Sequence, residues 1–255
     1  MKVKLKKIAK LLGAVQIRTL YRYFGFTKDL FVFKKVYNKS KNKRFSFNLK
    51  HLYPCVNDNT TNTSFDRHYV WHTAWAARKL EELNPEIHYD ISSSLNFVSI
   101  VSAFIPIRFY DYRPANMHLS KLESKHADLT QLPFDDNSIS SLSCMHVVEH
   151  IGLGRYGDPV DIDGDLKAME ELKRVVKKGG DLLFVVPIGK NIIMYNAHRI
   201  YRYSQIVEYF NNFKLIEFSL ITDPGQEDAI VNNASEELSD KQEYGCGLFH
   251  FKKIK

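Results

Sequence analysis

Asp90-Ile91-Ser92-Ser93-Ser94-Leu95-Asn96 is the stretch that decides the fold, because it links a short apolar run to a helical pattern. The apolar run at residues 87–91 predicts a buried strand, and the pattern at residues 96–104 predicts a helix. A strand, a tight turn of small residues and a helix form the first half of a βαβ unit. The next strand is predicted at residues 107–110. The sequence therefore favours the α/β class.

The same alternation of short apolar runs and helical stretches continues to the end of the chain. It predicts a doubly wound, Rossmann-like sheet of seven mostly parallel strands with helices on both faces. The last two strands have no strong helix between them, so we expect an antiparallel last strand, an ending that distinguishes methyltransferase sheets from nicotinamide-binding ones. The further strands are predicted at 124–127, 139–145, 181–186, 215–220 and 245–252, and the further helices at 65–83, 165–176 and 204–211.

Charge divides the chain of 255 residues into two parts. Residues 1–50 contain fifteen Lys or Arg and one acid, Asp29, which gives +14, so the remainder carries −7 of the total +7. We therefore predict a basic, partly helical N-terminal extension at 1–53 and an α/β domain at 54–255. Within the extension, apolar residues recur at helical spacing beside lysines, which suits an interfacial helix. They are Val3, Leu5, Ile8, Leu11, Leu12, Val15 and Leu20.

Such an arm suits a peripheral contact with an anionic membrane or with a glycosyltransferase complex, although a solvated arm or packing on the main domain would give the same pattern. Nucleic acid is disfavoured as a partner because the catalytic half is acidic. Cys55, Cys144 and Cys246 are odd in number and far apart, which excludes a disulfide framework and a C-x-x-C metal knuckle. With no run of eighteen apolar residues, the sequence predicts a cytoplasmic protein, with a peripheral position at the inner face of the membrane as the open alternative.

In an open α/β sheet the ligand lies outside the carboxyl ends of the strands. Asp90, Ser92 and Ser94 follow the first strand. Asp111 follows the second, twenty-one residues after Asp90, at the distance where a carboxylate accepts ribose hydroxyls; an ion pair with Arg113 is the alternative. After the third strand, Asp128 and Leu129 are placed to read an adenine amino group, unless Asp128 is an ordinary turn acid.

His146-Val147-Val148-Glu149-His150 follows the fourth strand and matches the H-x-x-E-H zinc signature. That signature needs a helix, whereas here it follows a strand and two glycines come next. We therefore predict no metal, and expect His146 near the cofactor and His150 in a substrate-facing or structural role.

Two polar segments lie at the same edge of the predicted sheet. The first is a glycine-rich acidic loop with Arg155, Tyr156, Asp158 and Asp163, and a solvated turn is its alternative reading. The second is Asn196-Ala197-His198-Arg199-Ile200-Tyr201, in which His198 suits a general base and Arg199 an anion clamp, or the two form a structural pair.

Several runs resemble known proteins. Three of them resemble runs in class I S-adenosylmethionine-dependent methyltransferases. These three are the run from Asp128 through Leu132-Pro133-Phe134-Asp135-Asp136, the pair Glu149-His150, and Lys177-Lys178-Gly179-Gly180. More specific runs resemble an uncharacterised bacterial and nematode domain-of-unknown-function family within that superfamily, over about residues 54–251. They are Phe65-Asp66-Arg67-His68-Tyr69, His88-Tyr89-Asp90-Ile91, Gly154-Arg155-Tyr156-Gly157-Asp158-Pro159, Gly164-Asp165-Leu166-Lys167-Ala168 and His198-Arg199-Ile200-Tyr201.

The resemblance implies S-adenosylmethionine as cofactor, with serines at 92–94 where that superfamily has glycines. It further implies an O-methyltransferase acting on a sugar, a nucleotide-sugar or a surface polysaccharide. A glycan enzyme that does not methylate, with an ion held by Asp158, Asp161 and Asp163, and an inactive docking protein are the alternatives. Cofactor binding is expected at Asp90, Ser92, Ser94, Asp111, Asp128, Leu129 and His146, catalysis at His198, Asp158 and His150, and substrate binding at Arg155, Tyr156, Asp163, Asn196, Arg199 and Tyr201.

Overall fold

A computed structural model describes residues 2–225 and 230–255, with side chains from residue 16 onward. The chain divides into two compact units, Met1–Ser64 and Phe65–Lys255, which are described separately. The apolar residues from Val3 to Val15 that predicted an interfacial helix lie outside the described side chains. No helix in the described ranges is long and apolar enough to cross a membrane.

The N-terminal unit consists of one long helix and a short turn of 3-10 helix. Helix α1 spans Lys2–Lys39, and η1 spans Leu49–His51. Phe33, Tyr37 and Phe47 form a small aromatic cluster, in which the Tyr37 hydroxyl donates to the carbonyl of Phe45 at 2.9 Å. This cluster folds the chain after α1 back onto the end of the helix.

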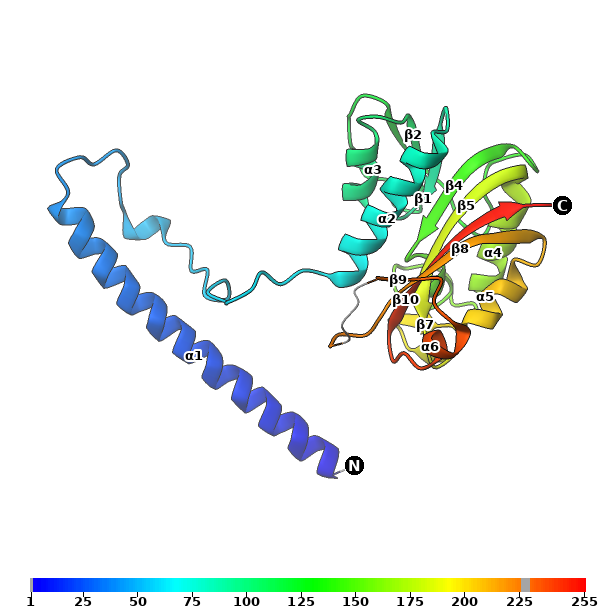
Figure 1. The fold of residues 1–255 in the computed structure, drawn as a ribbon. Coiled ribbons are helices and arrows are strands. Elements are labelled where there is room, and N and C mark those ends of the chain that lie inside the picture. Colours follow the sequence, from blue (N-terminus) through cyan, green and yellow to red (C-terminus); the bar gives the residue numbers. More distant parts are fainter. Residues whose placement is uncertain (1, 226–229) are drawn as a thin grey trace. The chain divides into compact units, whose positions relative to one another are not determined.

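The second unit contains a sheet of eight strands in the order β3-β2-β1-β4-β5-β10-β8-β9 (Figure 1). The first five strands run parallel, β10 is antiparallel to both β5 and β8, and β9 is antiparallel to β8. This confirms the predicted mostly parallel sheet with an antiparallel last strand. The strands are β1 His88–Ile91, β2 Ile107–Asp111, β3 Leu122–His126, β4 Ile139–Met145, β5 Val176–Ile188, β8 Phe213–Ile221, β9 Ile230–Asn232 and β10 Gly245–Lys253.

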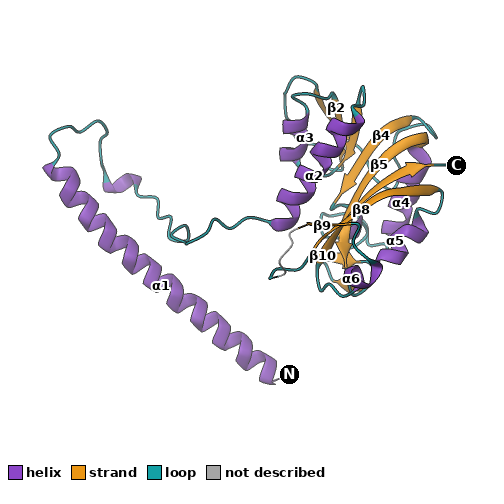
Figure 2. Cartoon of the chain, in the orientation of Figure 1, coloured by secondary structure: helices purple, strands orange, loops and turns teal. Residues whose placement is uncertain are grey.

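Helices cover both faces of the sheet (Figure 2). Helix α2, Arg67–Leu83, and helix α3, Leu95–Val101, pack on one face, where Trp75, Leu80 and Val98 belong to a buried cluster. Helix α4, Gly164–Val175, and helix α5, Tyr203–Tyr209, pack on the other face over a second cluster. Both clusters lie within Phe65–Lys255, so this unit has its own core.

Short elements that the sequence did not reveal surround this frame. The three-residue edge strand β9 extends the predicted seven strands to eight, and β6, Ile192–Met194, pairs with β7, His198–Ile200, as a separate hairpin. Helix α6 covers Glu236–Asp240. Elements of three to five residues carry too little hydrophobic periodicity to be recognised, and tertiary contacts decide them.

Candidate functional site

A pocket of about 390 Å³ opens at the carboxyl ends of β1, β2, β3 and β4. The strand order reverses between β1 and β4, so the pocket lies at the switch point where open α/β sheets bind ligands. Eight of the residues predicted from sequence line it: Ser92, Asp111, Asp128, Leu129, His146, His150, Tyr156 and Asp158.

The serine loop after β1 adopts the turn for which glycine is usually selected. Ser92 has a φ of 55°, in the left-handed region that costs a residue with a Cβ about 1–2 kcal/mol. Its hydroxyl donates to the carbonyl of Tyr110 at 3.2 Å, and the Ser93 hydroxyl accepts from the backbone N–H of Met145 at 3.0 Å. Both side chains thus bond to neighbouring strands, and these bonds help offset the strain of the turn.

Asp90 lies beneath this loop and outside the pocket, contrary to its predicted contact with the cofactor. It is fully buried, and burial raises the pKa of its carboxyl to about 6. The carboxyl accepts from the Ser93 N–H at 3.0 Å and from the Ser143 hydroxyl, and Ser143 in turn contacts the ring of His88 at 2.8 Å. Asp90 therefore positions the loop. Ser94, the N-cap residue of α3, is not among the residues that line the pocket either.

Asp111 and Asp128 face the pocket from adjacent strand ends, and each is oriented by its own turn. One oxygen of Asp111, Oδ1, accepts from the N–H of Arg113 at 2.7 Å, so the pairing with Arg113 is through its backbone. Oδ1 of Asp128 accepts from the N–H and the hydroxyl of Thr130 at 2.8 and 2.7 Å. In both residues the hydrogen bonds made within the described part of the chain go to Oδ1 and not to Oδ2.

His146 and His150 sit at the end of β4, around a buried glutamate. The ring Nδ1 of His146 lies 2.7 Å from Oε1 of Glu149, and burial lowers the pKa of His146 to about 4 and raises that of Glu149 to about 7. Nδ1 of His150 lies 2.6 Å from the carbonyl of Ala197, which fixes the proton on this nitrogen. Burial lowers the pKa of His150, which favours the neutral ring, and its Nε2 lies 3.7 Å from Oε1 of Glu149.

The acidic loop after β4 is organised by its own carboxylates. Oδ2 of Asp158 accepts from the N–H of Gly152 at 2.8 Å, and Oδ1 accepts from the N–H of Tyr156 at 3.1 Å. Asp161 pairs with Lys167 and accepts from the N–H of Asp163. Because these carboxylates hold the turn together, the arrangement does not favour the divalent ion considered for the loop. Asp163 is exposed outside the pocket.

Arg199 and Tyr201, two other residues predicted to contact the substrate, are buried and hold neighbouring parts of the chain in place. Arg199 is 5% exposed; it donates to the carbonyl of Ile151 at 2.7 Å and forms an ion pair with Asp165, whose other oxygen accepts from the Tyr201 hydroxyl at 2.9 Å. The predicted substrate-binding roles of Arg199 and Tyr201 are thus replaced by roles in packing. Their neighbours in sequence gave no sign of this burial.

Three further predicted residues also lie outside the pocket lining. Asn196 is exposed in the turn between β6 and β7. His198 stacks on Tyr244 at 4.7 Å between ring centroids, and its ring is 6.3 Å from that of His150. Arg155 donates to the carbonyl of Ala197 at 3.0 Å and stacks on Tyr156. Of these two histidines, His150 and not His198 lines the pocket, where it joins His146.

Sequence reasoning missed several residues that line the pocket. Tyr69 comes from α2, which precedes the sheet, so the strand-end rule does not reach it. Tyr112 and Arg113 follow Asp111 directly, and the Arg113 guanidinium lies 4.8 Å from the ring centroid of Tyr156. Lys167 belongs to α4. The run Phe65-Asp66-Arg67-His68-Tyr69, singled out by resemblance, was the one signal that pointed to Tyr69.

Several solved structures have a fold similar to that of this chain, and some of them are methyltransferases. The YcgJ protein of Bacillus subtilis has a TM-score of 0.52 at 15% identity, covering 72% of this chain and 98% of that chain. The N-methyltransferase NodS of Bradyrhizobium japonicum, in complex with S-adenosylhomocysteine, has 0.52 at 12%, covering 79% and 92%.

A third such structure is the 1,6-didemethyltoxoflavin-N1-methyltransferase of Burkholderia thailandensis, with its substrate and S-adenosylhomocysteine bound. It has a TM-score of 0.53 at 8% identity and covers 72% of this chain and 79% of that chain. At such identities the likeness shows the fold, which is that of class I methyltransferases.

The model of one protein family matches residues 110–245, more than half of the chain, and is described as "Caenorhabditis protein of unknown function, DUF268". No curated protein matches the sequence. The matched range contains Asp111, Asp128, His146, His150 and Asp158, so most of the pocket lies inside it.

Proposed function

Since the chain belongs to this DUF268 family and has the class I methyltransferase fold, we propose that it is an S-adenosylmethionine-dependent O-methyltransferase acting on a sugar or nucleotide-sugar hydroxyl. The observation that carries the proposal is the pocket at the switch point, with Asp111 and Asp128 at adjacent strand ends and a serine loop already in the left-handed turn. Two of the neighbouring structures hold S-adenosylhomocysteine.

The residues present fit such a cofactor. Oδ2 of Asp111 would accept the hydroxyl hydrogens of the ribose, and Oδ2 of Asp128, with the backbone of Leu129, would contact the adenine. Since the hydroxyls of Ser92 and Ser93 bond to Tyr110 and Met145, their polar atoms are satisfied without a ligand. When bound, the cofactor supplies an electrophilic methyl group.

His150 is the residue that would take the proton of the acceptor hydroxyl. Its Nδ1 proton is bound to the Ala197 carbonyl, its lowered pKa favours the neutral ring in which Nε2 is unprotonated, and it lines the pocket beside Tyr156. Nε2 would accept the hydroxyl proton as the acceptor oxygen takes the methyl group, whose bond to the sulfonium sulfur would break and leave a neutral thioether. Positioning by Tyr156 and Arg113 would supply most of the remaining rate enhancement, because methyl transfer depends on in-line placement.

Isothermal titration with S-adenosylhomocysteine tests the cofactor site. We expect one site in the full chain, with affinity reduced about 10–100-fold in Asp111→Asn, because a hydrogen bond to a charged group is worth about 1.5–3 kcal/mol. The asparagine keeps an oxygen for the N–H of Arg113, so the turn is preserved. Asp135→Asn, in an exposed turn, is the matched control and should bind like the wild type. Absence of binding in the wild type would refute the proposal.

The acceptor class is tested by measuring release of S-adenosylhomocysteine with a panel of nucleotide-sugars. We expect turnover with at least one of them, and a kcat about 100-fold lower in His150→Gln with unchanged cofactor affinity, as is typical for loss of a general base. Turnover that is equally fast in His150→Gln would remove the assigned role of this histidine.

We also propose that the N-terminal unit contacts the inner face of an anionic membrane. Ile17, Leu20, Tyr21, Phe24 and Phe31 recur at helical spacing on α1 and are all more than half exposed, in a segment with a charge of +14. Liposomes containing phosphatidylserine should pellet the full chain and fail to pellet a chain lacking residues 1–25. Equal pelleting of both chains, or of neither, would exclude this contact.

A further inference from the structure

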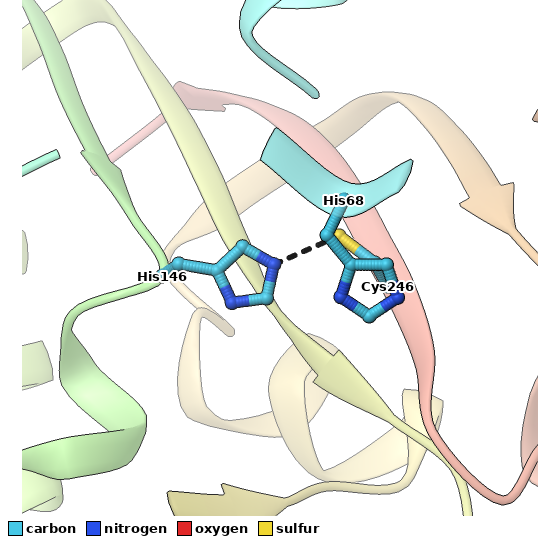
Figure 3. A group of neighbouring side chains, drawn as sticks. All are labelled: His68, His146 and Cys246. Atoms are coloured by element: carbon cyan, nitrogen blue, oxygen red, sulfur yellow. Dashed lines mark hydrogen bonds between the residues drawn. The ribbon is translucent and has the colours of Figure 1, made fainter. Parts of the chain in front are cut away.

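Three residues from distant parts of the chain meet beside the pocket: His68 from α2, His146 from the end of β4 and Cys246 from β10. Figure 3 shows the two imidazoles and the thiol converging, and the nitrogen and sulfur atoms that they offer all lie within 4.8 Å of one another. Nε2 of His146 and Sγ of Cys246 are 3.3 Å apart. Two ligands of a tetrahedral zinc, at about 2.0 and 2.3 Å from the ion, lie roughly 3.5 Å apart. This pair therefore already has a spacing suited to one ion.

The surroundings orient His146 as a metal ligand. Glu149 contacts its Nδ1 at 2.7 Å, so the proton resides on Nδ1 and the Nε2 lone pair points toward Cys246. A histidine that binds zinc commonly donates its other ring N–H to a carboxylate in this way. His146 also has a φ of 57°, a left-handed conformation that is uncommon for residues with a side chain. The ring of His68 lies between those of His146 and Tyr244, with centroid distances of 5.2 and 4.8 Å.

A second, independent observation comes from His72, one turn after His68 on α2. Its side chain is fully buried, and neither ring nitrogen makes a hydrogen bond of good geometry among the described residues, with the backbone of His68 as a neighbouring polar group. Its ring centroid lies 5.2 Å from that of His146. A buried polar group left unsatisfied costs about 1–3 kcal/mol, and a cluster of imidazoles with open nitrogens around one thiol is the composition of a metal site.

We propose that His68, His146 and Cys246 bind a zinc ion. Two imidazoles and one thiolate are ligands typical of zinc, and three protein ligands leave a fourth position for water or an acceptor oxygen. The site differs from the H-x-x-E-H reading of the sequence, because Nδ1 of His150 is engaged by the Ala197 carbonyl and the partners of His146 come from α2 and β10. Because His146 also lines the pocket, the ion borders it. Binding the ion requires no cofactor, so the proposal stands independently of methyl transfer.

The test is zinc binding by the full chain. After dialysis against a chelator, titration with zinc chloride should give one equivalent bound with sub-micromolar affinity, and cobalt in its place should give a thiolate-to-cobalt charge-transfer band. Cys246→Ser should remove the band, and His68→Gln should weaken zinc binding at least 100-fold. Cys144→Ser, another buried cysteine near the end of β4, and the exposed Cys55→Ser are the matched controls and should retain both signals.

Glu149→Gln should weaken zinc binding about 10–100-fold, the usual effect of removing a carboxylate behind a histidine ligand. Circular dichroism of each metal-free variant establishes that it is folded, and His68→Gln is the safer of the ligand variants because His68 is only half-buried. Absence of stoichiometric zinc in the wild type, or a cobalt band that survives in Cys246→Ser, would overturn the proposal.

Discussion

Ser92 illustrates how a single residue can hide a recognisable site. Serines at 92–94 remove the glycine pattern by which a cofactor loop is usually recognised, yet Ser92 has the φ of 55° that the glycine would supply. The backbone is held there by Asp90, whose carboxyl accepts from the Ser93 N–H. The strain at one residue is thus balanced by a buried hydrogen-bonding network beneath it.

That network makes stability depend on pH. Burial raises the pKa of Asp90 to about 6, above its unfolded value near 4, so between these pH values the folded state binds more protons than the unfolded state. The free energy of unfolding should therefore fall as pH rises from 4 to 6, by about 2 kcal/mol. Asp90→Asn, which keeps the shape and loses the charge, should remove this part of the fall. Urea unfolding at pH 4 and 7 measures it.

Asp135→Asn, at an exposed position, serves as the control for loss of a carboxylate. The same decrease with pH in Asp90→Asn as in the wild type would show that the Asp90 carboxyl is not the group responsible.

Among the structural elements, the loop that leads from η2 (Val148–His150) to α4 forms one wall of the pocket. Gly152 has a φ of +78°, and a Cβ there would lie 2.0 Å from the carbonyl oxygen of Asp161; Gly157 has a φ of +83° with nothing within 4 Å. Gly157→Ala should therefore cost only about 1–2 kcal/mol of unfolding free energy for its backbone strain. Gly152→Ala should cost clearly more, because the loop must open.

The two variants should also differ in binding. S-adenosylhomocysteine affinity should fall in Gly152→Ala and be nearly unchanged in Gly157→Ala, as measured by titration calorimetry together with urea unfolding. Equal effects of the two substitutions would show that packing against Asp161 does not shape the pocket.

The helices and strands show which features of the structure sequence patterns can predict. Strand β4 was predicted at its observed bounds because its run is short and almost wholly buried, and the predicted helix at 165–176 is shifted by one residue from α4, whose buried residues recur at helical spacing. Ser92, Asp111 and Asp128 could be predicted as pocket residues because the strand-end rule is topological. Arg199 could not be placed, since its burial depends on the carbonyls of Ile151 and Ile162, which no local pattern reveals.

The arrangement of the whole second unit explains the features that sequence patterns did not predict. The cluster of His68, His146 and Cys246 joins residues up to 178 positions apart, and Tyr69 reaches the pocket from a helix that precedes the sheet. Spacing rules for metal ligands apply to neighbours in sequence and do not detect this cluster; the prediction of no metal rested on the position of His146-Val147-Val148-Glu149-His150 after a strand. Only the sheet order, which sets β10 beside β5, brings Cys246 to the end of β4.

The proposed function requires the switch-point pocket to bind the methyl donor. The most direct measurement is a crystal structure of the full chain with S-adenosylhomocysteine at saturating concentration. We expect the ribose of S-adenosylhomocysteine to lie against Asp111 and its adenine beside Asp128 and Leu129. Its amino-acid end should lie over Ser92 and Ser93. A ligand bound elsewhere on the molecule, or an unchanged pocket without ligand density under those conditions, would contradict this expectation.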